Sequence, residues 1–167
     1  MKKLLSLLLL TLAVSFGACA QAPSPGIPDG TAAPNFTLPD AQGKEISLSD
    51  LKGKWVVLDF WGSWCRWCIK GFPQMKENYA KLGDEVAFVG VACRDSKENW
   101  LKALDQYKLP WINLWASDDN LKKISADYSL RGFPTKLIID PAGKVRNTTI
   151  GEDPSFYDTL NSLISGK

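Results

Sequence analysis

Residues 56–68 read VVLDFWGSWCRWC and join an apolar run to two cysteines that lie three positions apart. The apolar part is rich in β-branched and aromatic side chains, which is typical of a buried strand, and we place that strand at residues 54–60. Residues 65–82 have the pattern of a helix, so the cysteines fall in its first turn. At that position the free N–H groups and the dipole of the helix favour a thiolate on Cys65. The stretch therefore predicts a reactive thiol where a strand turns into a helix.

The two cysteines can close a small disulfide ring while the helix continues. We expect Cys65 to be the attacking nucleophile, with Arg66 adding a positive charge beside it, because thiols in such places can have a pKa lowered from about 8.5 to roughly 3.5–7.5. Cys68 would be the buried resolving thiol that breaks a mixed disulfide with the substrate. The alternatives are a structural disulfide or half of a zinc site. Zinc needs four ligands, and beyond the N-terminal segment the chain offers only Cys93 and no histidine.

Cys93 ends a second apolar run, which we interpret as a strand at residues 85–92. Parallel strands share one edge of a sheet at their C-terminal ends, so Cys93 is expected on the same edge as Cys65. A lone cysteine that closes a buried strand is more often a small hydrophobic residue. A redox role and a packing role therefore both stay open.

Strand and helix patterns alternate along the rest of the chain, which implies parallel pairing through crossover helices. The resulting fold class is α/β with a mixed sheet. Further strands are expected at residues 135–139 and 145–150; further helices are expected at residues 96–108 and 120–128, and after a cap at Asp153-Pro154, ending near Ser165.

The composition excludes several classes of function. The chain has 167 residues, 45% of them hydrophobic and 23% charged, as in an average globular protein. Its 20 Lys and Arg residues nearly balance 18 Asp and Glu residues, so nucleic acid is not an expected partner. With no histidine, a Ser-His-Asp triad, an H-E-x-x-H zinc site and histidine haem ligation are excluded. No cofactor is expected beyond the cysteine pair itself.

The N-terminus has the pattern of an export signal. Residues 1–20 combine a basic start, an apolar run and a small-residue cleavage region. Cleavage before Gln21 is one interpretation; a lipobox that makes Cys19 the lipidated first residue is the one we favour. Residues 21–33 are rich in Pro and Gly and are expected to be a linker, and residues 34–167 a single domain. The protein is therefore expected in the periplasm or cell envelope, touching a membrane only through that lipid.

The stretch VVLDFWGSWCRWC, with Pro73 after it, and LRGFPT at residues 130–135 resemble the two signatures of the thioredoxin family. The chain is most similar to the extracytoplasmic TlpA/ResA-like branch, which is related to the AhpC/TSA proteins. Residues 33–38 and 43–54 match the N-terminal hairpin of that branch, and residues 96–115 match its inserted helix and strand. The resemblance implies a thioredoxin-like fold, with a central mixed sheet flanked by helices.

The resemblance also implies roles for single residues. Pro134 matches the family's cis-proline, which faces the disulfide and leaves the backbone of Phe133 free to pair with an extended substrate segment. Asp59 matches the buried acid that lies beneath the active site in thioredoxins. An acid inside an apolar strand should have a raised pKa, which would let it accept the Cys68 proton directly or through water; the alternative is a structural acid held by hydrogen bonds. The residues expected to contact substrate are Trp61, Trp64, Arg66, Trp67 and Phe133.

Two departures from the family pattern bear on function. The cytochrome-maturation branch usually carries a Glu where this chain has Gly71, and the Arg66-Trp67 dipeptide does not indicate a redox potential. We expect a reductase of thiol- and disulfide-containing envelope proteins, supplied by a membrane thiol donor. The alternatives are an oxidase or isomerase that uses the same cysteines, a peroxidase, and a non-catalytic module that binds clients.

Overall fold

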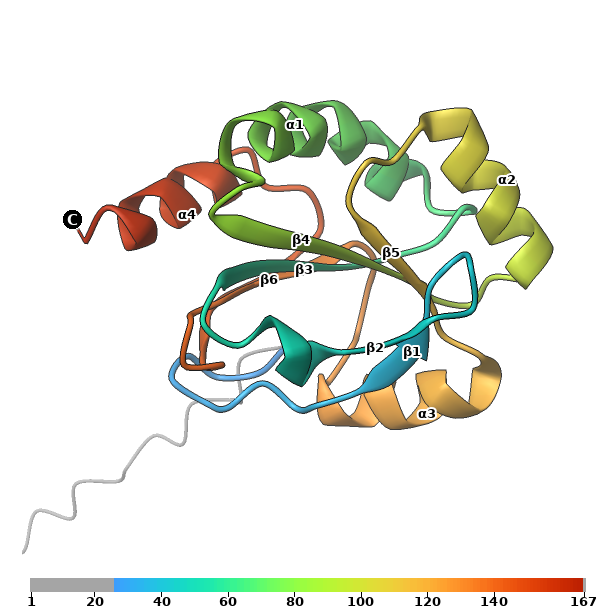
Figure 1. The fold of residues 1–167 in the computed structure, drawn as a ribbon, viewed down its shortest axis with the longest axis horizontal. Helices are drawn as coiled ribbons and strands as arrows, with labels where there is room; N and C mark the ends of the chain where they lie inside the picture. Colours follow the sequence, from blue (N-terminus) through green and yellow to red (C-terminus); the bar gives the residue numbers. More distant parts are fainter. Residues whose placement is uncertain (1–25, 167) are drawn as a thin grey trace, which may run out of the picture.

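The computed structural model describes residues 26–166. The expected signal segment and the possible lipidation site Cys19 lie outside these residues. A five-stranded mixed sheet forms the centre, in the order β5-β4-β3-β6-β7 (Figure 1). Its first three strands in this order are parallel, and the other two alternate in direction; the strands are β3 (Trp55–Trp61), β4 (Val86–Ala92), β5 (Ile112–Trp115), β6 (Thr135–Ile139) and β7 (Val145–Ile150).

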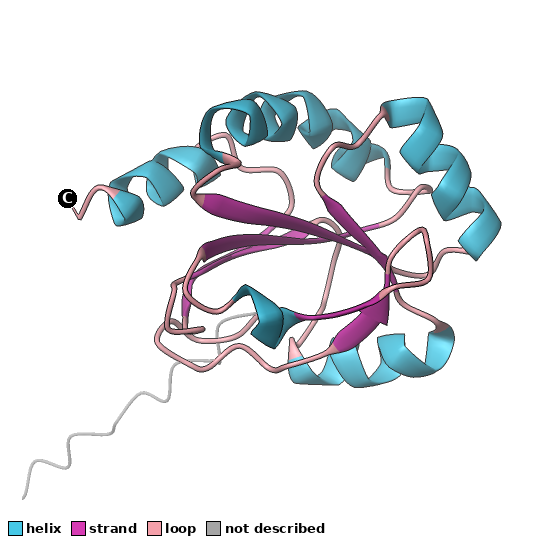
Figure 2. Cartoon of the chain, in the orientation of Figure 1, coloured by secondary structure: helices cyan, strands magenta, loops and turns pink. Residues whose placement is uncertain are grey.

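Helices and a small hairpin cover the two faces of this sheet (Figure 2). Alternate side chains of β3 point to opposite faces, because a strand has a two-residue period. Val57 and Trp61 point to the face that is covered by the helices α1 (Arg66–Leu82), α2 (Lys97–Tyr107) and α4 (Phe156–Ile164). Leu58 and Phe60 point to the other face. That face is covered by helix α3 (Asp118–Asp127), the antiparallel strands β1 (Thr37–Pro39) and β2 (Glu45–Ser47), and the short helix η1 (Leu48–Leu51).

The expected thioredoxin-like arrangement is confirmed, including the N-terminal hairpin and the inserted helix and strand. Two helix starts differ from expectation. Helix α3 begins two residues earlier, because Ser117 accepts a hydrogen bond from the N–H of Asn120 and acts as its N-cap. The cap of α4 is Ser155; the Asp153 carboxylate accepts hydrogen bonds from the N–H and hydroxyl of Ser155 just outside the helix.

The described end of the expected linker lies against the domain. Ile27 is buried, and the Gly30 N–H donates to the Val145 carbonyl at 2.7 Å. The Ala33 N–H donates to the Gly143 carbonyl at 2.9 Å. Residues 26–33 therefore pack beside the start of β7, and the part of the linker before them lies outside the described residues.

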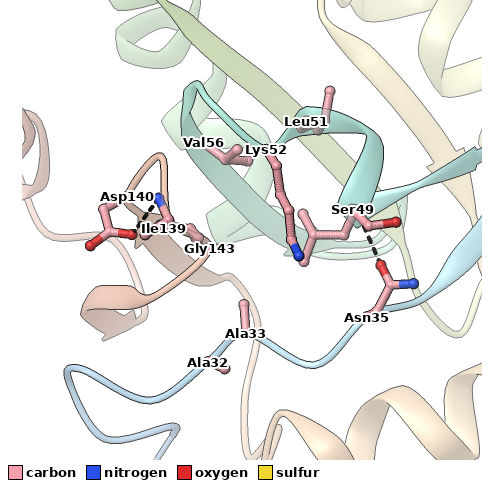
Figure 3. A pocket seen from close by; sticks show the side chains of 12 residues that line it. Ala32, Ala33, Asn35, Ser49, Leu51, Lys52, Val56, Ile139, Asp140 and Gly143 are labelled. Carbon is pink, nitrogen blue, oxygen red and sulfur yellow. Dashed lines mark hydrogen bonds between the residues drawn. The ribbon is translucent and has the colours of Figure 1, made fainter.

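The C-terminal ends of β3, β4 and β5 meet the N-terminal end of β6 at one edge of the sheet. The residues singled out by the sequence gather at this edge. The pocket in Figure 3 lies at the opposite end of β3, between Val56, Lys52 and Gly143, and includes none of those residues. Within residues 26–166, no helix is both long and apolar enough to cross a membrane.

Candidate active site

Cys65 is the N-cap of α1 and is joined to Cys68 by a disulfide. The Cys65 Sγ accepts a hydrogen bond from the Cys68 N–H at 3.2 Å, as a thiolate at this position would. Cys65 is 5% exposed and Cys68 is 1% exposed, so Cys65 is the cysteine that a partner reaches first. The greater exposure of Cys65 is compatible with its expected role as the attacking thiol.

The loop before Cys65 is held by the segment that follows β4. The Asp95 carboxylate accepts hydrogen bonds from the N–H of Ser63 at 2.6 Å and from its hydroxyl at 2.7 Å. The Trp64 indole N–H donates to the Cys93 carbonyl at 3.1 Å. Gly62 is required here, because a Cβ at this position would lie 2.4 Å from the indole nitrogen of Trp64. These contacts fix the turn that presents Cys65.

An aromatic surface surrounds the disulfide. Trp64 is 50% exposed and Trp67 is 60% exposed, and the ring of Phe133 meets that of Trp64 edge to face at 5.5 Å. Cations lie over this surface, with Lys70 Nζ 4.5 Å from the Trp67 ring and the Arg94 guanidinium 5.4 Å from the Phe133 ring.

Two more of the expected contact residues differ in position. Arg66 is exposed at the first position of α1. Trp61, in contrast, is completely buried and packs on Phe72, so the expectation that it forms part of the substrate surface is wrong. The alternation of β3 directs its side chain inward.

Pro134 is buried in the segment that leads into β6, and the Phe133–Pro134 peptide bond is cis, as the resemblance implies. The Pro134 carbonyl accepts a hydrogen bond from the Gly151 N–H at 2.8 Å. Through the contact of Phe133 with Trp64, this segment lies beside the active-site loop.

Asp59 is 2% exposed and lies between Val57 and Trp61 on the face of β3 that packs against the helix of the cysteines. Burial raises the pKa of this carboxyl to about 6; the positive charge of Lys136 opposes the shift, and the negative charge of Glu152 adds to it. Its Oδ1 has no hydrogen-bond partner among the described residues. The raised pKa expected from the sequence is confirmed, and at neutral pH this carboxylate is able to take up a proton.

Three neighbours of this site were not identified from the sequence. Lys136 is directly opposite Asp59 on β6 and bonds to Glu152, and Tyr157 interacts electrostatically with both acids. Lys136 was visible as a lone charge in the apolar run TKLII. Glu152 and Tyr157 follow β7 at a distance along the chain that no local pattern connects to the cysteines.

Cys93 is completely buried and belongs to the core on the other face of the sheet from Cys65 and Cys68. Its thiol contacts the Val91 carbonyl at 3.5 Å, and burial raises its pKa far above the ordinary value. A thiol in this state is a poor nucleophile, which favours the packing role. Among residues 26–166, no group of three or more His, Cys, Asp or Glu side chains is placed to hold a metal ion.

Residues 30–148 match the sequence pattern of the AhpC/TSA family. The chain belongs to the AhpC/TSA family. Among its relatives, the thiol-disulfide oxidoreductase ResA of Bacillus subtilis is 35% identical over 147 residues, which cover 84% of this chain and 79% of the relative. The thioredoxin-like protein YneN of the same organism is 34% identical over 129 residues, or 75% of this chain and 74% of the relative.

Solved structures show the same fold. The thioredoxin domain of a thiol-disulfide oxidoreductase from Bacteroides vulgatus superposes with a TM-score of 0.78 at 32% identity, covering 83% of this chain and 99% of the other. A thiol:disulfide interchange protein from Bacteroides sp. gives a TM-score of 0.77 at 31% identity, with coverages of 84% and 92%. Together with the disulfide at the start of α1, these likenesses make this AhpC/TSA-family chain a thiol–disulfide oxidoreductase that works by dithiol exchange.

Proposed function

We propose that the protein is an extracytoplasmic reductase of protein disulfides. The observation that carries this proposal is the Cys65 Sγ at the N-cap of α1, bonded to a backbone N–H and ringed by exposed aromatic side chains. The N-terminal sequence supports export, and the proposed anchor is a lipid on Cys19. The proposed partners are disulfide-containing proteins of the envelope and a membrane thiol donor.

The reaction proceeds in two exchange steps. The thiolate of Cys65 attacks a substrate disulfide, forms a mixed disulfide with one sulfur and releases the other as a thiolate. Cys68 then gives its proton to Asp59 and attacks the Cys65 Sγ. The bond between Cys65 and the substrate breaks, the second substrate sulfur leaves as a thiolate, and the Cys65–Cys68 disulfide forms. The substrate gains two electrons, and the donor later returns two to the protein.

Each remaining residue of the site has a role in substrate binding. Trp64, Trp67 and Phe133 supply apolar area on which a flexible segment can rest, and Arg66 supplies charge. Pro134 shapes the segment whose backbone, at Phe133, pairs with an extended substrate strand. This surface is open, which suits a polypeptide better than a small molecule.

Cysteine variants test the order of attack. Incubated with a disulfide-bonded protein such as insulin, a Cys68→Ser variant should accumulate a mixed disulfide at Cys65, visible by mass spectrometry of non-reduced digests. A Cys65→Ser variant should trap almost none, because Cys68 is shielded. Cys93→Ser is the matched control and should turn over like the wild type. Equal trapping by both active-site variants would contradict the assignment.

The same cysteines could serve an oxidase or isomerase. These activities differ from the reductase in the reduction potential of the pair, so one equilibrium measurement separates them.

A further inference from the structure

A row of polar positions crosses the sheet beneath α1. Gly90 of β4, Asp59 of β3 and Lys136 of β6 are direct cross-strand partners, with Asn113 of β5 at one end of the row. Asp59 and Lys136 are the charged members, at 2% and 3% exposure. They share the face of the sheet that packs against the helix of the cysteines. Two opposite charges are thus buried side by side, close to the redox centre.

The buried lysine has its own counter-ion. The Lys136 ammonium bonds to Oε1 of Glu152, in the connection between β7 and α4. The Glu152 side chain is 18% exposed, so the pair extends from the interior to the surface. An ion pair at this depth needs both partners, because a single buried charge is strongly unfavourable.

Gly71 makes room for this counter-ion. A Cβ at Gly71 would lie 2.3–2.5 Å from three atoms of the Glu152 carboxyl group. Gly71 stands three residues after Cys68 on α1, so the carboxylate lies against the turn of helix that carries the resolving thiol. A larger residue at this position would displace the carboxylate.

Every element around Asp59 contributes a titratable group. These are Lys136 from β6, Glu152 from the connection after β7, Tyr157 from α4, Cys68 from α1 and Cys93 at the end of β4. The Tyr157 hydroxyl has no partner among the described residues, and its pKa is raised by burial and by both acids, so it stays neutral. The Cys93 thiol also stays neutral, because burial raises its pKa far above the ordinary value. Cys68 is the group whose proton Asp59 receives in the proposed reaction. Lys136 and Glu152 are therefore the charges that act on Asp59.

We propose that Lys136 and Glu152 are positioning residues that set how readily Asp59 takes the proton of Cys68. Lys136 favours the carboxylate form of Asp59, and Glu152 offsets part of that effect. The inference rests on the proposed function, in which Asp59 accepts the proton when Cys68 attacks the mixed disulfide. The two residues touch neither sulfur nor substrate; they act through Asp59.

The test uses Ellman's reagent, an aromatic disulfide, and the reduced protein without its signal segment, which has Cys65, Cys68 and the buried Cys93 as its thiols. Cys65 attacks the reagent and releases one thionitrobenzoate; Cys68 then attacks Cys65 and releases a second, whose rate is followed by stopped-flow absorbance against pH. In the wild type this second rate should fall as the pH drops through about 6, where Asp59 becomes protonated. Asp59→Asn should abolish this fall in the second rate at acid pH.

Removing the charge of Lys136 and removing that of Glu152 should shift the midpoint of this pH dependence in opposite directions. Lys136→Met removes the charge that favours the carboxylate and should shift the midpoint up by roughly one pH unit; Glu152→Gln should shift it down by a similar amount. The midpoint of the double variant should lie between those of the two single variants. If Glu152→Gln folds poorly because Lys136 loses its counter-ion, the double variant removes that unpaired charge. Gly71→Ala keeps both charges but displaces the carboxylate, so its midpoint should move in the same direction as that of Glu152→Gln.

An exposed ion pair on the same helix provides the matched control. Lys81 and Glu77 are bonded at 2.7 Å at the far end of α1, and Lys81→Met and Glu77→Gln should leave the midpoint unchanged. A midpoint that stays fixed in both charge variants, or that moves the same way in both, would overturn the inference while leaving dithiol exchange intact. A wild type that releases only one thionitrobenzoate would overturn the proposed function as well.

Discussion

At the scale of single residues, Asp59 is a carboxyl group whose charged form is unfavourable where the fold places it. A carboxyl group with 2% exposure and an unpartnered oxygen loses hydration that the fold does not replace. Its pKa of about 6 means that the folded protein holds the proton more tightly than an unfolded chain, for which the ordinary value is 3.8. An apolar residue would suit the strand better, and the presence of an acid here supports the proposal that Asp59 takes part in proton transfer at the disulfide.

Asp59→Asn tests this cost. Because the folded-state pKa is raised, the unfolded state loses the proton first, and wild-type stability falls as the pH rises from about 4 to about 6. Urea unfolding of the oxidised protein should show similar stabilities at pH ~4 and a variant more stable by about 2–3 kcal/mol at pH ~7. Asp84→Asn, at an exposed position, is the control and should show no such trend. A variant no more stable than the wild type at neutral pH would contradict a buried charge.

At the scale of elements, the redox centre depends on two turns that follow neighbouring parallel strands. The turn after β3 carries Cys65, and the turn after β4 carries Asp95, which bonds to the backbone and hydroxyl of Ser63. The Asp95 carbonyl also accepts a hydrogen bond from the Trp115 indole at 2.9 Å, which connects the turn to the end of β5. The three strand ends therefore position the nucleophile together.

Asp95→Ala should loosen this arrangement. It removes two hydrogen bonds to a charged group and leaves the Ser63 N–H without its partner, so we expect a loss of about 2–3 kcal/mol in the free energy of unfolding. Denaturant unfolding measures this, and faster hydrogen exchange at residues 62–65 would locate the change. Asp84→Ala should alter stability by less than about 0.5 kcal/mol. Exchange that is unchanged in this loop would show that Asp95 does not hold it.

Local sequence patterns predicted most elements and the cysteine pair, because strand runs, helix caps and the C-x-x-C spacing are all short-range features. Helix α1 was expected within one residue of its start for this reason. The Lys136–Glu152 pair was missed because it depends on which strands become neighbours and on the space above Gly71. Trp61 was misplaced because its direction depends on the register of β3, which the sequence does not state.

At the scale of the whole molecule, charge is unevenly distributed around the site. The chain carries a formal net charge of only +2, yet exposed cations lie beside the disulfide or over the aromatic side chains around it: Arg66, Lys70 and Arg94. Asp95, the acid next to Arg94 in the sequence, supplies one negative charge against these cations, so the balance around the site is positive. Partners with acidic residues near their cysteines should therefore associate faster than basic ones.

Salt dependence tests this preference. Reduction of a disulfide peptide with acidic flanks should be faster than that of a basic one in about 0.01 M salt, and the difference should vanish near 1 M, where the Debye length falls from about 30 to about 3 Å. Replacing Lys70 and Arg94 by Gln should lower the low-salt advantage several-fold. The same change at Lys102 and Lys122, which lie elsewhere on exposed helix faces, should not. If the two double replacements lowered the advantage equally, the preference would come from the net charge of the protein and not from the cations beside the disulfide.

The most direct test of a reductase is the equilibrium reduction potential of the Cys65–Cys68 pair. The protein without its signal segment is equilibrated in buffers of defined dithiol-to-disulfide ratio, and the fluorescence of the adjacent Trp64 and Trp67 reports the fraction reduced. A potential near or below about −250 mV, close to that of thioredoxin, is predicted for a reductase supplied with electrons by a donor. A potential above about −180 mV would contradict that direction and indicate an oxidase or isomerase; no reversible transition at all would contradict dithiol exchange itself.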